Sequence, residues 1–254
     1  MRHVAIALLT AAFVVPVIVD ARLGAWQAED LTNLEAEATR ALRVETEPFS
    51  TRAALVARLQ AGSERAPSAE QRGRLALLWL RAVRSLLASV PVGNSDQQPY
   101  RDWLARHETV VAYSEPAGQW LLIPDVVWRV HDAHKSAESA EEIAWFAVEN
   151  GYPGECEGYI PCYANIMNWL DGEYLRRHPR GRHGSEAVAQ VHSSLVEAVK
   201  RLSGRFAADY LNPSTDGGDL KAGLEPLRQA ILASNADRRS QAVGVIDELL
   251  ARCR

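Results

Sequence analysis

The sequence predicts a mainly α-helical fold, in which an α-α helical array carries one small β-hairpin near residues 109–123. Apolar residues recur at spacings of three and four along most of the chain, and this period is typical of amphipathic helices. Short segments rich in glycine, proline and small polar residues separate these stretches, so consecutive helices are expected to be neighbours. One region has two β-favouring runs with a turn between them, which predicts a single hairpin.

The first helices are expected between residues 22 and 90. An apolar stripe predicts one helix within residues 26–43, and a second helix follows over residues 49–61. After a break, Ser68 has the side chain of a helix N-cap, and Glu70 lies in the first turn, where a negative charge is favourable. The third helix is expected to extend to about residue 90.

A linker then divides the chain. Residues 91–99 (PVGNSDQQP) have the composition of a connecting segment. This division predicts N-terminal helices over residues 22–90 and a second helical domain over residues 100–254. The alternative is one continuous domain over residues 22–254.

The hairpin prediction comes from residues 109–113 and 119–123, which are rich in β-branched and aromatic side chains. The five residues between them include proline and glycine, which favour a turn. A lone hairpin is marginally stable in water, so this one must pack on helices. Pro124 ends the second strand, and Asp125 is expected to cap the next helix.

Two more helices are predicted around the cysteines. Ser139 and Glu142 match a capping box, which predicts a helix start at Ser139 and a helix to about Asn150. A further helix is expected over residues 163–177, where a proline soon follows.

The last helices follow from position 185. Ser185 is expected to cap a helix with the most regular apolar stripe of the chain: Val188, Val191, Leu195, Val199, Leu202 and Phe206. Residues 211–219 (LNPSTDGGD) are predicted to be a loop, with Asp219 capping the helix that follows. A final helix carries Val243, Ile246, Leu249 and Leu250.

Three cysteines add a constraint. Cys156 and Cys162 are six positions apart, with Gly158 and Pro161 between them. On a continuous helix their Cα atoms would be about 9 Å apart, whereas a disulfide needs about 7 Å or less. The pair therefore predicts a disulfide across a turn, and Cys253 is left either free or in an intermolecular bond. A metal site is the weaker alternative, because C-x5-C is not a usual zinc spacing.

The start of the chain predicts export. A basic tripeptide (MRH) precedes an uncharged run over residues 4–19, and small residues at a cleavage point complete a secretory signal. We predict a signal peptide over residues 1–21 with cleavage after Ala21, and Ala25 as the second choice. An uncleaved anchor fits less well, because a spanning helix needs about twenty apolar residues. A secreted or periplasmic protein without a transmembrane segment is expected.

The charge pattern argues against a nucleic-acid partner. The formal net charge is −4, from 28 Lys and Arg against 32 Asp and Glu, whereas nucleic-acid binding needs a clustered basic surface. Basic residues gather in one place, between Arg176 and His183. One interpretation is a patch for anions or lipid headgroups. The other is a solvated helix end, where cations favour the negative pole of the helix dipole.

Candidate catalytic groups are few. His131 and His134 lie three apart on a predicted helix and could bind zinc from one face, which makes a metal-dependent hydrolase the alternative function. The segment reads H-D-A-H, however, and not H-E-x-x-H. Glu155 and Glu157 could act as an acid–base pair, although loop solvation is the simpler interpretation. With no G-x-S-x-G and no phosphate-binding glycine loop, we predict no catalytic residues, metal or cofactor.

Tryptophan is concentrated in the middle of the chain. Five of the seven tryptophans lie there: Trp103, Trp120, Trp128, Trp145 and Trp169. Core packing explains most of them. The functional alternative is an aromatic-lined groove for a peptide or a glycan, because tryptophan often anchors interfaces.

Residues 174–187 (YLRRHPRGRHGSEA) join two predicted helices. Proline ends the first helix, glycine lets the chain reverse, and Glu-Ala begins the next helix. The segment resembles tetratricopeptide-like helical repeat proteins of bacterial envelopes, within a match over residues 141–187. The resemblance implies helix-pair packing and a binding scaffold without catalysis.

Together these features predict an exported, non-catalytic helical scaffold or binding protein of the cell envelope. Its partner is expected to be a protein or a peptide. The concave helix face and the aromatic region near residues 100–170 are the predicted contact surface. The alternative is the metal-dependent hydrolase centred on His131 and His134.

Overall fold

The computed structural model describes residues 28–44, 46–151, 156–204 and 207–253. The predicted signal peptide over residues 1–21 and the cleavage sites after Ala21 and Ala25 lie outside these ranges, as does Glu155.

The N-terminal part contains α1 (Ala28–Ala41), α2 (Phe49–Arg65), α3 (Ala69–Leu87) and α4 (Tyr100–Arg106). Ser68 caps α3 as predicted, because its Oγ accepts a hydrogen bond of 3.1 Å from the backbone N–H of Gln71. Helix α2 packs along α3, and α1 contacts both. The apolar stripes predicted on these helices are largely buried where the helices contact one another.

The hairpin consists of β1 (Val111–Ser114) and β2 (Gln119–Leu122). The strands are antiparallel, with Val111 opposite Leu122 and Ser114 opposite Gln119. Strand β2 packs against α3, which supplies the helical surface that a lone hairpin needs. The predicted hairpin is confirmed.

The remaining helices begin with α5 (Pro124–Ala133) and α6 (Ala140–Glu149). Helix α7 (Ile160–Met167), the π-helical segment η1 (Asn168–Gly172) and α8 (Glu173–Arg177) follow one another without a break. They are followed by α9 (Gly184–Leu202), α10 (Ala207–Tyr210), α11 (Pro213–Ala233) and α12 (Arg239–Ala251).

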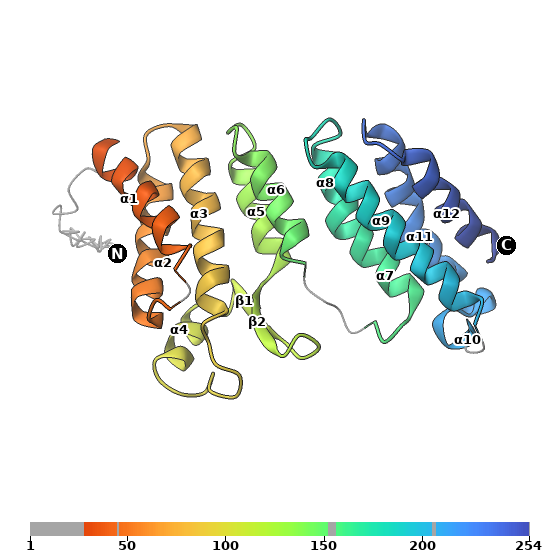
Figure 1. Cartoon of the computed structure of the whole chain (residues 1–254), viewed down its shortest axis with the longest axis horizontal. Coiled ribbons are helices and arrows are strands. Elements are labelled where there is room, and N and C mark those ends of the chain that lie inside the picture. The colour runs from red at the N-terminus through yellow and green to blue at the C-terminus, as the bar shows by residue number, and fades with distance from the viewer. Residues whose placement is uncertain (1–27, 45, 152–155, 205–206, 254) are drawn as a thin grey trace, which may run out of the picture.

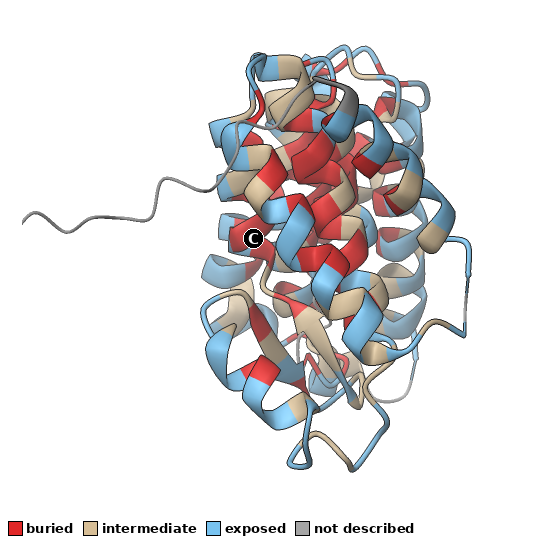
Figure 2. Ribbon diagram, turned by 90° about the vertical axis from the view of Figure 1, so that its left-hand side faces the viewer, coloured by how far each residue is buried: buried red, intermediate tan, exposed pale blue. Residues whose placement is uncertain are grey.

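The helices stand side by side along the longest axis of the molecule, from α1 at one end to α12 at the other (Figure 1). Neighbouring contacts include α5 with α6, α7 with α11, and α9 with α12. One continuous cluster of buried apolar residues extends from Leu31 in α1 to Leu249 in α12, and these residues line the inner faces of the helices (Figure 2). The mainly α fold with one small hairpin is confirmed.

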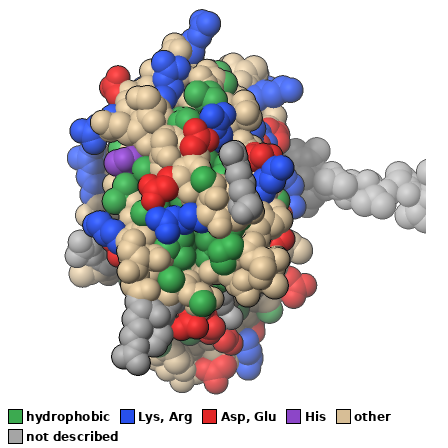
Figure 3. Space-filling view, turned by 90° about the vertical axis from the view of Figure 1, so that its right-hand side faces the viewer, with side chains coloured by type: hydrophobic (Ala, Val, Ile, Leu, Met, Phe, Trp, Pro, Cys, Tyr) green, Lys and Arg blue, Asp and Glu red, His purple; other side chains and the backbone are tan. Residues whose placement is uncertain are grey.

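The C-terminal end of the array presents a mixed surface. Apolar side chains gather near the middle of this face, with acidic and basic side chains around them (Figure 3). No helix in the described ranges has the length and apolar character needed to cross a bilayer.

The predicted capping box at Ser139 is wrong. Ser139 precedes α6, but its Oγ makes no capping hydrogen bond and has no partner at all. The carboxylate of Glu142, which a capping box would place on the backbone N–H of Ser139, instead contacts Arg182 at 2.6 Å and His183 at 2.8 Å. Both residues lie in the segment after α8. Partners from a distant segment, the Arg182 guanidinium among them, thus replace the local cap.

The predicted starts of the last helices need correction as well. Helix α9 begins at Gly184, and Ser185 instead exchanges hydrogen bonds with Asp237. The predicted loop over residues 211–219 is wrong, because α11 begins at Pro213 and continues through it. Asn212 is the N-cap, with its side chain accepting from the N–H of Ser214. Proline is well suited to the first helical position, so Asn-Pro starts this helix and Asp219 caps nothing.

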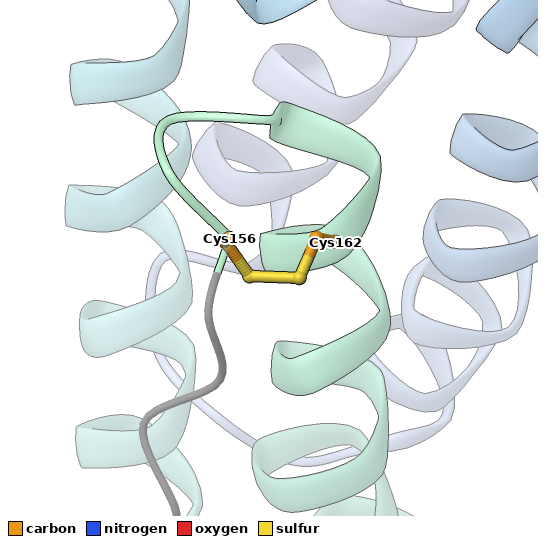
Figure 4. The surroundings of a disulfide bond; sticks show 2 residues. All are labelled: Cys156 and Cys162. Atoms are coloured by element: carbon orange, nitrogen blue, oxygen red, sulfur yellow. A yellow bond between two sulfur atoms is a disulfide. The ribbon is translucent and has the colours of Figure 1, made fainter. Parts of the chain in front are cut away.

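The predicted disulfide between Cys156 and Cys162 is confirmed, with the two Cα atoms 5.5 Å apart (Figure 4). Cys162 lies in the first turn of α7, and Cys156 lies in the loop before it. The turn between them has Gly158 at a φ of 95°, which favours glycine. A Cβ at this position would also overlap the ring of Tyr210. Cys253 is a free, partly buried thiol.

Candidate functional site

Two histidines meet at one end of α5. His131, which is 5% exposed, lies on α5, and His178 directly follows α8. Their Nε2 atoms are 2.9 Å apart, and Nη1 of Arg177 lies 2.9 Å from Nδ1 of His131. The same Nδ1 lies 3.2 Å from the Asp132 carboxylate, so it can accept from Arg177 or donate to Asp132, and the tautomer of His131 decides which of the two nitrogens is the donor. Burial is the largest cause that lowers the pKa of both imidazoles, so the pair is neutral near pH 7.

His134 has different neighbours. It follows α5, lies beside Gly73, and has a pKa lowered by burial and by the nearby charge of Arg72. Within the described ranges, no three His, Cys, Asp or Glu side chains are grouped so that they could hold a metal ion. Among the described residues, His131 and His134 therefore do not belong to a group of three such side chains.

A second polar cluster, the α6–α8 clamp, joins the start of α6 to the segment after α8. The Tyr174 hydroxyl donates to Glu141 at 2.9 Å and accepts from the N–H of His183 at 3.1 Å. The N–H of Arg182 also donates to Glu141, at 2.5 Å. A Cβ at Gly181 would overlap the tyrosine hydroxyl, so the clamp needs glycine there. These bonds fix the two helices relative to each other.

The basic run between Arg176 and His183 is largely neutralised within the protein. Arg176 and Arg177 each contact Glu173 on the same helix, and Arg177 also contacts Asp132 of α5. Arg182 contacts Glu142. With three arginines already paired to carboxylates, this run does not present the concentrated positive charge that an anion site requires.

A groove of about 560 Å³ opens at the opposite end of α6. Its lining comes from Arg84 and Leu87 of α3 with Ala88 just after it, all of β2, residues 149–151 at and after the end of α6, and Ile166 and Leu170 of α7 and η1. The volume lies within the range of small-molecule and peptide sites, about 300–1,000 Å³. Four segments that are far apart in the sequence thus form one concave surface.

The polar groups around this groove are unusual. Asn150 is 6% exposed, and its Nδ2 has no hydrogen-bond partner. The indole N–H of Trp120 also has none. An unsatisfied buried donor costs about 1–3 kcal/mol. Arg84 lies over the ring of Phe146 at 4.7 Å and only 3.9 Å from Glu149, so both signs of charge are present.

The five central tryptophans have different roles. Trp103, Trp128 and Trp145 are 4–6% exposed and belong to the core. Trp120 lines the groove, whereas Trp169 is 38% exposed on η1. Core packing therefore explains most of them, and a single indole contributes to the groove.

Sequence reasoning missed Asp171. This residue lies in η1, is 7% exposed, and its Oδ1 has no hydrogen-bond partner. Burial raises the pKa of its carboxyl from 3.8 to about 7. Segments of π-helix often occur at functional sites, but no local pattern predicts one here.

No family model, curated protein or solved structure matches this chain.

Proposed function

We propose that the chain is an exported, non-catalytic binding protein of the cell envelope, and that it holds a peptide or protein segment in the groove beside β2. The observation that carries the proposal is the groove itself, with its largely apolar lining and with buried, unsatisfied donors on two of the residues that line it. Such concave, largely apolar surfaces with a few polar groups are typical of binding sites.

Two further features support the proposal. A disulfide between Cys156 and Cys162 persists in oxidising compartments and is rare in the cytosol, which fits a chain with a predicted signal peptide. The side-by-side helices resemble the tetratricopeptide-like scaffolds that the segment over residues 174–187 suggested. Scaffolds of this kind bind partners on extended concave surfaces.

Site-specific photo-crosslinking in intact cells tests the proposal. A photoreactive amino acid replaces Gln119, which is exposed at the groove, or Gln60, which is exposed on α2 as a matched control. We expect adducts with a peptide or protein from position 119 and not from position 60.

A blocking variant completes the experiment. Ala88→Trp places an indole in the groove from an exposed position, and Ala57→Trp makes the same change on exposed α2. The adducts at position 119 should disappear with the first change and persist with the second. Equal adducts from positions 60 and 119, or adducts that survive Ala88→Trp, would contradict the proposal.

A further inference from the structure

In the described part of the chain, β1 pairs with one edge of strand β2, and the other edge has no strand beside it. The N–H of Ile123 donates to the carbonyl of Val110 at 2.9 Å. In an antiparallel pair, residues that exchange hydrogen bonds alternate with residues that do not. With the observed register, Leu121 therefore bonds to Ala112, and Trp120 directs its N–H and C=O away from β1.

This edge faces the groove. All four residues of β2 line the groove, whereas a cavity over one face of a strand would meet only alternate side chains. Leu122 is fully buried, so the accessible part of the edge centres on Trp120. Apart from the bonds within the hairpin, no backbone–backbone hydrogen bond between described residues uses the N–H or C=O of Trp120.

On this basis, which rests on the proposed function, we propose that the ligand is an extended peptide segment that adds a third strand to the hairpin along β2. Strand addition satisfies the free backbone groups of the edge and seats alternate ligand side chains in the lining. The added strand would lie about 4.8 Å from β2, with Ile166 and Leu170 on its far side.

The residues that line the groove also indicate what kinds of side chain the ligand carries. Of the described residues that line the groove, Arg84 and Glu149 are the charged ones, and they lie 3.9 Å apart. The groove therefore has no net charge. We expect a segment in which apolar residues that face the lining alternate with solvent-facing residues, and binding that changes little with salt.

A library of random linear peptides displayed on phage supplies the probe. It is selected against the disulfide-bonded mature chain, and clones that lose binding to Ala88→Trp are kept. One selected peptide is synthesised with a single N-methyl group at each backbone amide in turn. Strand addition predicts a loss of about tenfold or more at every second position and little change between, because alternate N–H groups face β2.

The protein side is tested with Trp120→Pro and Trp120→Ala. Proline removes the outward N–H and is tolerated on an edge strand, whereas alanine removes the indole and keeps the N–H. We expect Trp120→Pro to abolish peptide binding and Trp120→Ala to retain the alternating methylation pattern. In the unmodified protein, bound peptide should slow hydrogen exchange of the Trp120 amide about tenfold or more. The Leu121 amide, already bonded within the hairpin, should not change.

The outcomes separate the two proposals. A peptide that depends on an open groove but tolerates N-methylation throughout, or leaves the Trp120 amide unprotected, overturns strand addition and leaves the binding function standing. A selection that yields no groove-dependent peptide overturns both.

Discussion

The buried carboxyl of Asp171 gives a quantitative prediction. Its environment in η1 raises its pKa from 3.8 to about 7, and burial is the cause. The folded state therefore favours the neutral carboxylic acid, whereas the unfolded chain ionises near pH 4. The stabilising effect is fully present below the unfolded pKa and is lost as the pH rises through about 7.

The size of the effect follows from that difference. A separation of about three pH units, at about 1.4 kcal/mol each, corresponds to a loss on the order of 4 kcal/mol between pH 4 and pH 8. Asp171→Asn keeps the shape of the side chain and cannot ionise. The variant should match the wild type near pH 4 and exceed its stability by a few kcal/mol at pH 8.

Urea unfolding followed by circular dichroism at intervals from pH 4 to pH 9 measures this difference. The quantity of interest is the stability of the variant minus that of the wild type, because other titrating groups then cancel. Asp219→Asn, at an exposed position on α11, serves as the control and should follow the wild-type profile. If the curves of Asp171→Asn and the wild type stay parallel from pH 4 to pH 9, the argument from burial is refuted.

Three further predictions follow. Replacing Cys156 and Cys162 by serine should lower the free energy of unfolding by about 2 kcal/mol, because the bond closes a ring of about seven residues, and a change near zero in urea unfolding would contradict this. His178→Gln removes a group whose pKa is lowered in the fold. The wild type should therefore lose stability relative to this variant as the pH falls below about 6.5, and a constant difference would count against a neutral imidazole pair. Intact-mass measurement of exported protein should show a chain that begins after Ala21 or Ala25, and a retained leader would remove the export prediction.

Local patterns predicted most of the fold. The Ser68 cap, the apolar stripes and the hairpin depend on neighbours within a few residues, and each is found in the structure. The capping-box prediction at Ser139 was wrong because the Glu142 carboxylate instead contacts Arg182 and His183, about forty residues away. The prediction of a loop over residues 211–219 was wrong because it rested on the two glycines, whereas Asn-Pro starts a helix at this point.

The candidate sites could not be predicted in the same way. His131 and His178 are 47 positions apart and meet only because α5 packs beside the end of α8. The groove combines four segments, and the edge of β2 opposite β1 becomes visible only when the register is known. The π-helical turn that buries Asp171 has no sequence signal, because it depends on the packing of α9 and α11 against η1.

Helix α6 connects the clamp to the groove. Glu141 in its first turn joins the hydrogen bonds of the clamp, and Glu149 and Asn150 at its other end line the groove. Glu141 and Glu149 are eight positions apart on this helix, which is about 12 Å along its axis. The clamp holds α6 against α8 at one end, and α6 also contacts η1, whose Leu170 lines the groove. A site built in this way loses little conformational entropy on binding. The groove therefore suits an extended ligand whose own backbone becomes ordered when it pairs with β2.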